Sequence, residues 1–421
     1  MAIATGAQII DALLARPGGP ELLELARARD GDVALVGGAV RDLLLGRGPR
    51  ELDVTAPDGV LLAQELAASL RTAASDGVRV TAHERFGTAI VEWDGARVDI
   101  ATRRAESYPA PGALPDVREG SVEEDLKRRD FTVNAIAVPL GGAHEGELLC
   151  APGALEDLAA ASLRALHDRS FLEDPTRLLR LARYSARLDF EPEPHTAALA
   201  AQALGAGALA TVSPARVGAE LRLALGEADA VAACAALDRL GVFVALEHRL
   251  RFDAELARRA LALLPADGCA DVLLLAILLL PVAIDLAEDP ESVMFELLDG
   301  WELTAAERER VMRTALVAPS LEREMELADM PSELYDALFA HTIEAVALGG
   351  ALGSSGSAAC EWIETLRHVR LEITGADLLA AGITTGPEIG QRLSVALTRK
   401  LDGELEDGRD AELRAALEGS G

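Results

Sequence analysis

Lysine is almost absent from this chain of 421 residues, in which it occurs only as Lys127 and Lys400. Arginine therefore carries nearly all of the positive charge, and the formal net charge is −29. So acidic a balance argues against a protein that binds nucleic acid over its whole surface, for which a basic balance is usual. It still allows RNA binding in a groove where arginine side chains cluster.

Cysteine is also scarce, and no long apolar segment is present. The four cysteines lie far apart, so their spacing predicts neither a zinc site nor a disulfide framework. Free thiols are typical of a reducing compartment, and with no signal-peptide pattern at the N-terminus we expect a cytoplasmic location. The longest apolar run, residues 272–284, is broken by Pro281 and is shorter than the ~20 residues that span a bilayer. It predicts a core helix, and we expect no membrane partner.

The stretch from residue 33 to 55 carries the strongest pattern. Residues 33–36 predict a buried strand that enters a tight turn at Gly37 and Gly38, and residues 39–45 have helical periodicity. Backbone N–H groups at such a strand-to-helix corner suit a phosphate, and Arg41 is placed to reach the same anion. Taken alone, a Gly-Gly pair is more often a plain helix cap.

Acidic residues follow on the next predicted strands. Glu51 and Asp53 are two residues apart and so project from one face, while their apolar neighbours point to the core. Asp99 lies on the second arm of a hairpin predicted for residues 87–102, where it is a candidate third carboxylate. Exposed strand acids are the alternative. Beside a phosphate cradle, carboxylates make sense if divalent cations bridge them to phosphates.

Three later stretches also have recognisable patterns. Residues 103–120 are rich in proline and glycine and predict a loop, used as a mobile flap. Ser121 with Glu124 forms a capping box that starts a helix. Later, Asp174 and the arginines that follow it are spaced by three along one drifting helical face. A charged row of this kind is often only a solvent-exposed helix face. Here few acidic residues lie four positions from the arginines, which argues that they bind an external anion.

In this order, the patterns resemble the tRNA nucleotidyltransferases (CCA-adding enzymes) and bacterial poly(A) polymerases of class II, in the DNA polymerase beta superfamily. The matching motifs are Gly-Gly-x-Val-Arg-Asp-x-Leu-Leu-Gly-Arg before acid-x-Asp, then Arg-Arg-Asp-Phe-Thr-x-Asn-Ala, then Glu-Asp-Pro-x-Arg. They span residues 33–187. Residues 373–390 also resemble the tail of long-form members, where a glycine-rich turn could hold an RNA phosphate.

The resemblance implies an α+β fold, with a nucleotidyltransferase palm (a small mixed sheet with helices) followed by an all-α neck, body and tail. The predicted parts are a head at 1–156, a neck with the nucleotide-recognition helix at 157–245, a body at 246–348 and an RNA-binding tail at 349–421. The Gly/Ala/Ser-rich residues 349–357 predict a linker. Homologues often carry an HD-type hydrolase module, but the histidines and aspartates it needs are not clustered here, and we expect none.

The implied activity is template-independent addition of CCA to the 3′ end of tRNA from CTP and ATP, with release of pyrophosphate. Glu51 and Asp53 would hold two Mg²⁺ ions, and Asp99 would assist. The positions that match the family's nucleotide-binding residues are Gly37, Gly38, Arg41, Arg129, Asp130, Asn134, Asp174, Arg177, Arg180 and Arg183. Of these, Asp174 and Arg177 match the pair that reads the incoming base by offering an acceptor and a donor.

One residue departs from the family pattern, which usually has aspartate where this chain has Glu51. The extra methylene moves the carboxylate by about 1.5 Å, and Mg²⁺ demands near-ideal geometry. We expect the strand to be set back to compensate; slow or lost activity are the other outcomes. The alternatives are therefore a poly(A) polymerase, a partial CC- or A-adding enzyme and, from another class, a catalytically silent RNA-binding relative.

Overall fold

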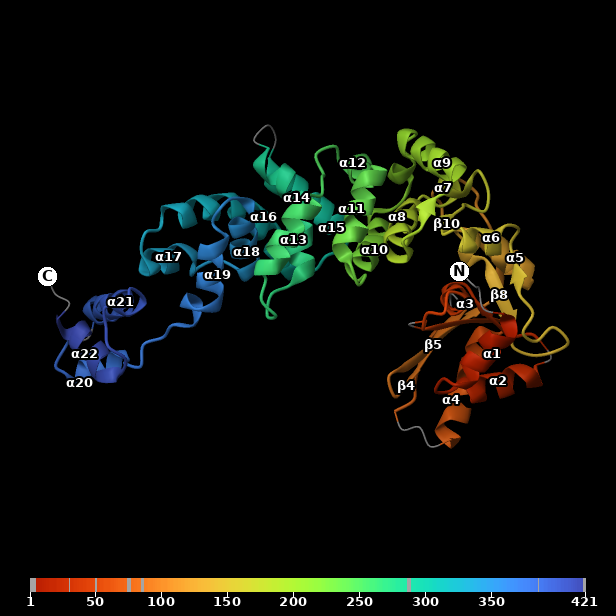
Figure 1. The fold of residues 1–421 in the computed structure, drawn as a ribbon, viewed down its shortest axis with the longest axis horizontal. Coiled ribbons are helices and arrows are strands. Elements are labelled where there is room, and N and C mark those ends of the chain that lie inside the picture. Colours follow the sequence, from red (N-terminus) through yellow and green to blue (C-terminus); the bar gives the residue numbers. More distant parts are fainter. Residues whose placement is uncertain are drawn as a thin grey trace. The chain divides into compact units, whose positions relative to one another are not determined.

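The computed structural model describes residues 5–29, 31–49, 51–73, 77–84, 87–285, 289–384 and 386–418 (Figure 1). The chain forms two compact units, Met1–Ser213 with Leu240–Ala245, and Pro214–Arg239 with Leu246–Gly421. The first unit contains a sheet with helices, and the described part of the second is built of helices. This confirms the predicted α+β class. The finer division into head, neck, body and tail stays a prediction.

A seven-stranded mixed sheet forms the centre of the first unit, in the order β3-β4-β5-β2-β1-β8-β9. Its strands are β1 (Ala34–Val36), β2 (Leu52–Ala56), β3 (Arg79–His83), β4 (Thr88–Trp93), β5 (Ala96–Thr102), β8 (Ile136–Pro139) and β9 (Leu149–Cys150). β2 and β5 run parallel, and the other neighbours are antiparallel. The parallel pair sets Asp53 directly opposite Asp99.

The predicted hairpin is confirmed as β4 and β5. Its two turn residues, Asp94 and Gly95, have φ angles of 43° and 77°. Positive φ at both positions gives the turn a twist that matches the flanking strands, and this requirement explains the Asp-Gly sequence.

Helices cover the apolar face of this sheet. α4 (Gly59–Thr72) contacts β2, β3, β4 and β5, and the strands offer it buried residues such as Val54, Val98 and Ile100. Successive strand residues alternate between faces, so Asp53 and Asp99 point to the opposite side. The other helices of this part are α1 (Gly6–Leu14), α2 (Gly19–Ala28), α3 (Gly38–Leu44), α5 (Val122–Lys127), η2 (Thr132–Asn134), α6 (Ala154–Ala159), α7 (Ser170–Glu173), α8 (Thr176–Leu188), α9 (Pro194–Gly205), η3 (Ala208–Thr211) and α12 (Val242–Leu246).

The sequence predicts a loop over residues 103–120, and this is wrong for part of the segment. The chain there forms an antiparallel ribbon of β6 (Arg104–Ser107) and β7 (Asp116–Glu119). Its connecting segment packs against the unit, where the N–H of Gly112 donates to the carbonyl of Leu172 at 3.2 Å. The strands are polar and lack β-branched runs, so only the turn formers between them were visible in the sequence. Another short pair, β10 (Ser162–Leu163) and β11 (Glu191–Pro192), is parallel.

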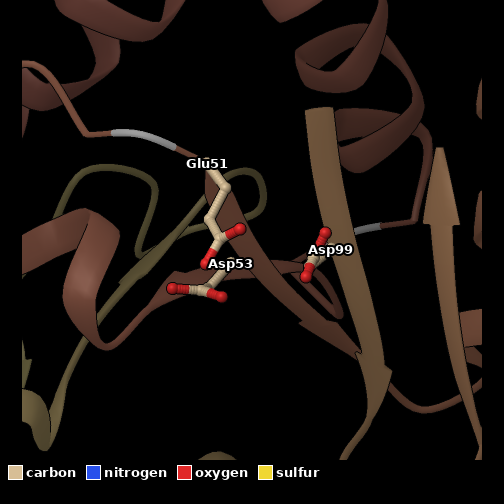
Figure 2. A group of neighbouring side chains, drawn as sticks. All are labelled: Glu51, Asp53 and Asp99. Carbon is tan, nitrogen blue, oxygen red and sulfur yellow. The ribbon is translucent and has the colours of Figure 1, made fainter. Parts of the chain in front are cut away.

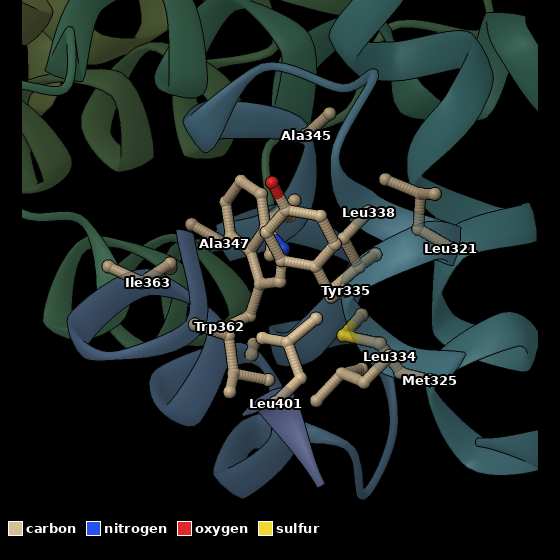
Figure 3. Close-up of a cluster of buried hydrophobic side chains, with 13 residues drawn as sticks. Leu321, Met325, Leu334, Tyr335, Leu338, Ala345, Ala347, Trp362, Ile363 and Leu401 are labelled. Atoms are coloured by element: carbon tan, nitrogen blue, oxygen red, sulfur yellow. The ribbon is translucent and has the colours of Figure 1, made fainter. Parts of the chain in front are cut away.

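The second unit stacks helices around apolar cores. One core gathers Tyr335, Trp362 and Leu401 with buried neighbours from several helices (Figure 3). The helices are α10 (Pro214–Leu225), α11 (Ala230–Leu240), α13 (Ala254–Leu263), α14 (Ala270–Ile284), α15 (Pro290–Gly300), α16 (Ala305–Leu327), α17 (Pro331–Leu338), α18 (Ile343–Leu352), α19 (Gly356–Glu364), η4 (Leu366–His368), α20 (Gly375–Ala380), α21 (Pro387–Leu401) and α22 (Arg409–Glu418). Among the described residues, no helix combines the length and apolarity needed to cross a membrane.

The predicted linker at residues 349–357 is wrong, because Gly349 and Gly350 are buried within α18. A Cβ atom on Gly349 would lie 3.0 Å from the carbonyl oxygen of Ala318 in α16, and one on Gly350 would lie 2.4 Å from the Cβ of Ala359 in α19. The small residues thus let three helices approach closely. A segment rich in glycine, alanine and serine is typical both of a flexible linker and of a close helix contact, so composition alone does not distinguish them.

Candidate active site

Three carboxylates meet on the polar face of the sheet (Figure 2). Asp53 in β2 and Asp99 in β5 are register partners, and Glu51 lies directly before β2. Each of the three residues offers one oxygen, and these oxygens lie within 4.8 Å of one another. The predicted gathering of the three side chains is confirmed, and the exposed Glu51 reaches the group with its longer side chain.

Asp53 has a raised pKa. Burial and the nearby charge of Glu51 raise its pKa to about 6, and the charge of Asp99 acts in the same direction. The charge of Arg129 and a hydrogen bond from the backbone N–H of Ala39 oppose the rise. Hard oxygen ligands crowded in this way suit a divalent cation, which would relieve their mutual repulsion.

Arg97 belongs to this group, although the sequence analysis assigned it no role. Its Nε and Nη2 atoms donate to Oδ1 and Oδ2 of Asp99 at 2.6 and 2.7 Å. Its Nε lies 3.5 Å from Oε2 of Glu51. The hydrogen bond to Asp99 is the main cause that raises the pKa of Arg97 above its usual value. Its position two residues before Asp99 was the signal that placed it on the same face.

The glycine corner makes room for charged side chains. Gly37 has φ 67° and ψ −131° between β1 and α3, as the corner prediction requires. A Cβ atom on Gly37 would lie 2.4 Å from Nη1 of Arg129, and one on Gly38 would lie 3.7 Å from Oδ2 of Asp53. Glycine at position 37 therefore serves both the backbone conformation and the approach of Arg129.

Arg41 is only 1% exposed and lies in the wall of the site. Its Nε and Nη2 donate to Oδ1 of Asp42 at 2.9 and 2.7 Å, and its Nη1 donates to Oδ1 of Asn134 at 2.5 Å. The contact with Asn134 joins the first sequence motif to the second. Its predicted contact with the triphosphate stays a prediction.

Asp125 holds the two arginines of the second motif, and the sequence analysis gave it no role. It is 1% exposed, and Oδ1 accepts from Nε and Nη2 of Arg128 while Oδ2 accepts from Nη2 of Arg129 at 3.0 Å. It lies in α5, whose predicted start at the Ser121–Glu124 capping box is confirmed. The spacing of three and four residues before the arginines was the available signal.

Asp130 links the second motif to the third. Oδ1 accepts from Nδ2 of Asn134 at 2.9 Å and from the N–H of Phe131 at 2.8 Å. Oδ2 accepts from Nε and Nη2 of Arg180 at 2.8 and 2.7 Å. Burial alone would raise the pKa of Asp130, but the charge of Arg180 and these hydrogen bonds lower it to about 2. Asp130 is therefore a fixed, ionised anchor.

Helix α8, predicted to be the nucleotide-recognition helix, differs in two respects from the sequence prediction. Asp174 precedes the helix, where its Oδ1 accepts from the N–H of Thr176 at 3.1 Å. Few acids lie four residues from these arginines in the sequence, but Arg180 is paired with Asp130, which comes from 50 residues earlier in the chain. Arg177 is 4% exposed, and it donates to Ser170 Oγ and to the carbonyl of Arg128, both at 2.7 Å.

Tyr184 brings three predicted arginines together around one aromatic ring. The guanidinium carbons of Arg41, Arg180 and Arg183 lie 5.5, 5.6 and 4.7 Å from its ring centroid. The edge of the ring meets Phe131 in a T-shaped contact at 6.0 Å. Stacking on a π-face stabilises such a concentration of positive charge. No pattern in the sequence singled out Tyr184.

Comparisons with known proteins agree with this geometry. The family model described as "Poly A polymerase head domain" matches residues 33–164. The A-adding tRNA nucleotidyltransferase of Halalkalibacterium halodurans is 42% identical over 54% of this chain, and the CC-adding enzyme of Deinococcus radiodurans is 42% identical over 50%. The alignments span only 52% and 54% of those two relatives. The CCA-adding enzyme of Limosilactobacillus fermentum is 28% identical over 91% of this chain and 92% of its own.

Solved structures extend the likeness along the chain. An apo CCA-adding enzyme matches with a TM-score of 0.80, 26% identity and 99% coverage of both chains. A CCA-adding enzyme in complex with CTP matches with a TM-score of 0.77, 25% identity, and coverage of 99% of this chain and 100% of the other. Together, these comparisons assign residues 33–164 to the poly(A) polymerase head-domain family and show that the whole chain is similar in fold to CCA-adding enzymes.

Proposed function

We propose that this chain adds nucleotides from CTP and ATP to the 3′ end of tRNA, and that it completes the CCA sequence. The observation that carries the proposal is one continuous network. It runs from Asp53, which feels the charge of Arg129, through a hydrogen bond from Arg129 to the carbonyl of Asn134, and from the Asn134 side chain through Asp130 to Arg180 of α8. The network unites all three sequence motifs within one unit. The CTP-bound neighbour supports a nucleoside triphosphate as the substrate.

Mg²⁺ is the cofactor that we propose, with Glu51, Asp53 and Asp99 as its ligands. When bound, the metal would activate the RNA 3′-hydroxyl and neutralise charge at the phosphates. The chain's own part is to orient the carboxylates and to bind the triphosphate. The N–H of Ala39 fixes Asp53, and the glycine corner with Arg129 offers donors to the phosphates.

Asp174 and Arg177 would read the base, and Asp130 with Asn134 would shape the sugar site. Ser170 and the carbonyl of Arg128 hold the Arg177 guanidinium in place, which pre-organises its remaining edge for a Watson–Crick contact. A rigid donor beside an acceptor could select C and A without a nucleic-acid template.

Arg177→Ala is expected to lower the preference for CTP over UTP by roughly 10- to 100-fold, because one base-reading pair contributes ~1–3 kcal/mol of discrimination. Competition between labelled CTP and UTP measures the ratio, which does not depend on the folded fraction. Arg169→Ala, which removes an exposed arginine at the start of α7, is the control and should leave the ratio unchanged. An unaltered ratio in Arg177→Ala would exclude base reading by this residue.

Glu51→Asp tests whether the backbone is placed for the longer side chain. The oxygens of the triad already lie within 4.8 Å of one another with glutamate present, so shortening Glu51 should withdraw a ligand. We expect a loss of roughly 10- to 100-fold in transfer rate, with Glu84→Asp on the exposed surface as the control. A variant as fast as the wild type would show that no compensation is built in.

The whole activity is tested by incubating the protein with Mg²⁺, a tRNA that lacks its 3′ end, and labelled CTP or ATP, separately and together. Addition of C, C and A with a clean stop is the expected result. A long adenosine ladder would instead indicate a poly(A) polymerase. Bound tRNA without incorporation would indicate a silent RNA-binding relative. The Asp53→Ala protein is the blank.

A partial adder is the second candidate. Its support is specific, because relatives that are 42% identical to this chain are named A-adding and CC-adding enzymes. In the same assay, a CC-adding enzyme would use CTP alone and stop after two additions. An A-adding enzyme would extend only a tRNA that already ends in CC.

A further inference from the structure

Arg97 binds both carboxylate oxygens of Asp99. Its Nε and Nη2 form two short, parallel hydrogen bonds to that carboxylate, and Glu51 lies 3.5 Å from the same guanidinium. Arg97 thus lies between the two outer carboxylates. Asp53, the central ligand, is held by the N–H of Ala39 instead and does not depend on Arg97.

A divalent cation and the Arg97 guanidinium would both bind the Asp99 carboxylate, so they compete for it. The side chain of Arg97 is 40% exposed, and a pair this open to solvent adds little stability. It can therefore be displaced at small cost. A retained guanidinium would repel the incoming cation and would keep both Asp99 oxygens engaged.

A second partner for Arg97 is already in place. Glu92 on β4 is the register partner of Arg97, so the two side chains share one face of the sheet. Glu92 is exposed and attracts the same guanidinium electrostatically. A small swing across the strand pair would exchange Asp99 for Glu92 without leaving Arg97 unpaired.

We propose that Arg97 is a positioning residue that neutralises the outer carboxylates before the metal arrives and moves toward Glu92 when a divalent cation binds. The inference rests on the proposed metal site and adds how that site is loaded. Arg97 lowers the affinity for free cation, so loading is favoured when a nucleoside triphosphate supplies phosphate oxygens to the same ion.

Titration of the full chain with Mn²⁺, followed by electron paramagnetic resonance without nucleotide or RNA, tests this directly. Arg97→Gln should bind Mn²⁺ roughly tenfold more tightly than the wild type, because one positive charge is removed a few ångströms from the ion. Arg97→Lys keeps the charge and should stay near the wild-type value. Arg71→Gln is the control for loss of a surface arginine, since Arg71 is exposed in α4, which covers the opposite face of the sheet.

Two variants distinguish a failure of the proposed role of Arg97 from a failure of the metal site. If Arg97→Gln binds Mn²⁺ with unchanged or lower affinity while Asp53→Asn abolishes binding, the metal site stands and the role of Arg97 is wrong. If Asp53→Asn binds as well as the wild type, the metal site itself is wrong. Thermal unfolding of each variant shows whether the protein is folded.

Discussion

An Asp53→Ala enzyme is expected to transfer no measurable nucleotide to tRNA. Asp53 is the central carboxylate, because it pairs in register with Asp99 and shares its face with Glu51. Loss of an outer-shell partner already costs roughly 10- to 100-fold in metal affinity or activity, and removal of a ligand should cost more. Single-turnover addition of labelled CTP at saturating Mg²⁺ measures the effect.

Folding stability is the control for the loss of activity at this position. Removal of the Asp53 charge should abolish transfer but should not lower the stability of the folded chain. The pKa of Asp53 is raised from 3.8 to about 6, so between these values the folded chain binds more protons than the unfolded chain. Folding stability from this group therefore falls as pH rises from 3.8 to 6. Asp53→Asn should remove that decline and should melt no lower than the wild type at pH 7. Wild-type activity in Asp53→Ala would overturn the catalytic assignment.

The two results together describe a site that sacrifices stability for function. A carboxylate that is buried beside Glu51 and Asp99 is unfavourable for the folded state, and the proposed cation would relieve this repulsion. Arg97 and Arg129 moderate the repulsion. An activity loss without a stability loss is what distinguishes such a group from a structural one.

Much of the site could be predicted because its geometry is local. Strand alternation sufficed to place Glu51 and Asp53 on one face, and the Asp-Gly turn sufficed to place Asp99 on the second arm of a hairpin. The glycine corner followed from the change of apolar pattern at Gly37. For Glu51, Asp53 and Gly37 the signal lies within a few residues of the feature it predicts, whereas the pairing of Asp99 with Asp53 joins two parallel strands that are distant in the chain.

Partners that are distant in the sequence could not be predicted in this way. Arg180 seemed to lack a counter-ion because the search was limited to its own helix, whereas Asp130 reaches it from another element. Arg41 seemed placed for an anion but is engaged by Asp42 and Asn134. Gly349 shows the same limit in packing, since only the fold decides whether small residues form a linker or a close helix contact.

Asp130→Ala is expected to destabilise helix α8 by about 3 kcal/mol. The change removes the Asp130 carboxylate that accepts from the Arg180 guanidinium, from the Asn134 side chain and from the Phe131 N–H. Native-state hydrogen exchange of α8 amides in the full chain measures the loss. Asp168→Ala removes a 78% exposed aspartate paired with His195, and it should cost less than about 1 kcal/mol.

The pH dependence gives this prediction an independent check. Because the pKa of Asp130 is lowered from 3.8 to about 2, its contribution is fully present above pH 3.8 and is lost as pH falls through 2. The difference between wild type and Asp130→Ala should therefore shrink in acid. A difference that persists at pH 2 would mean that packing of the side chain, and not its charge, anchors α8. Since α8 carries Arg177, the same anchor would position the residue proposed to read the base.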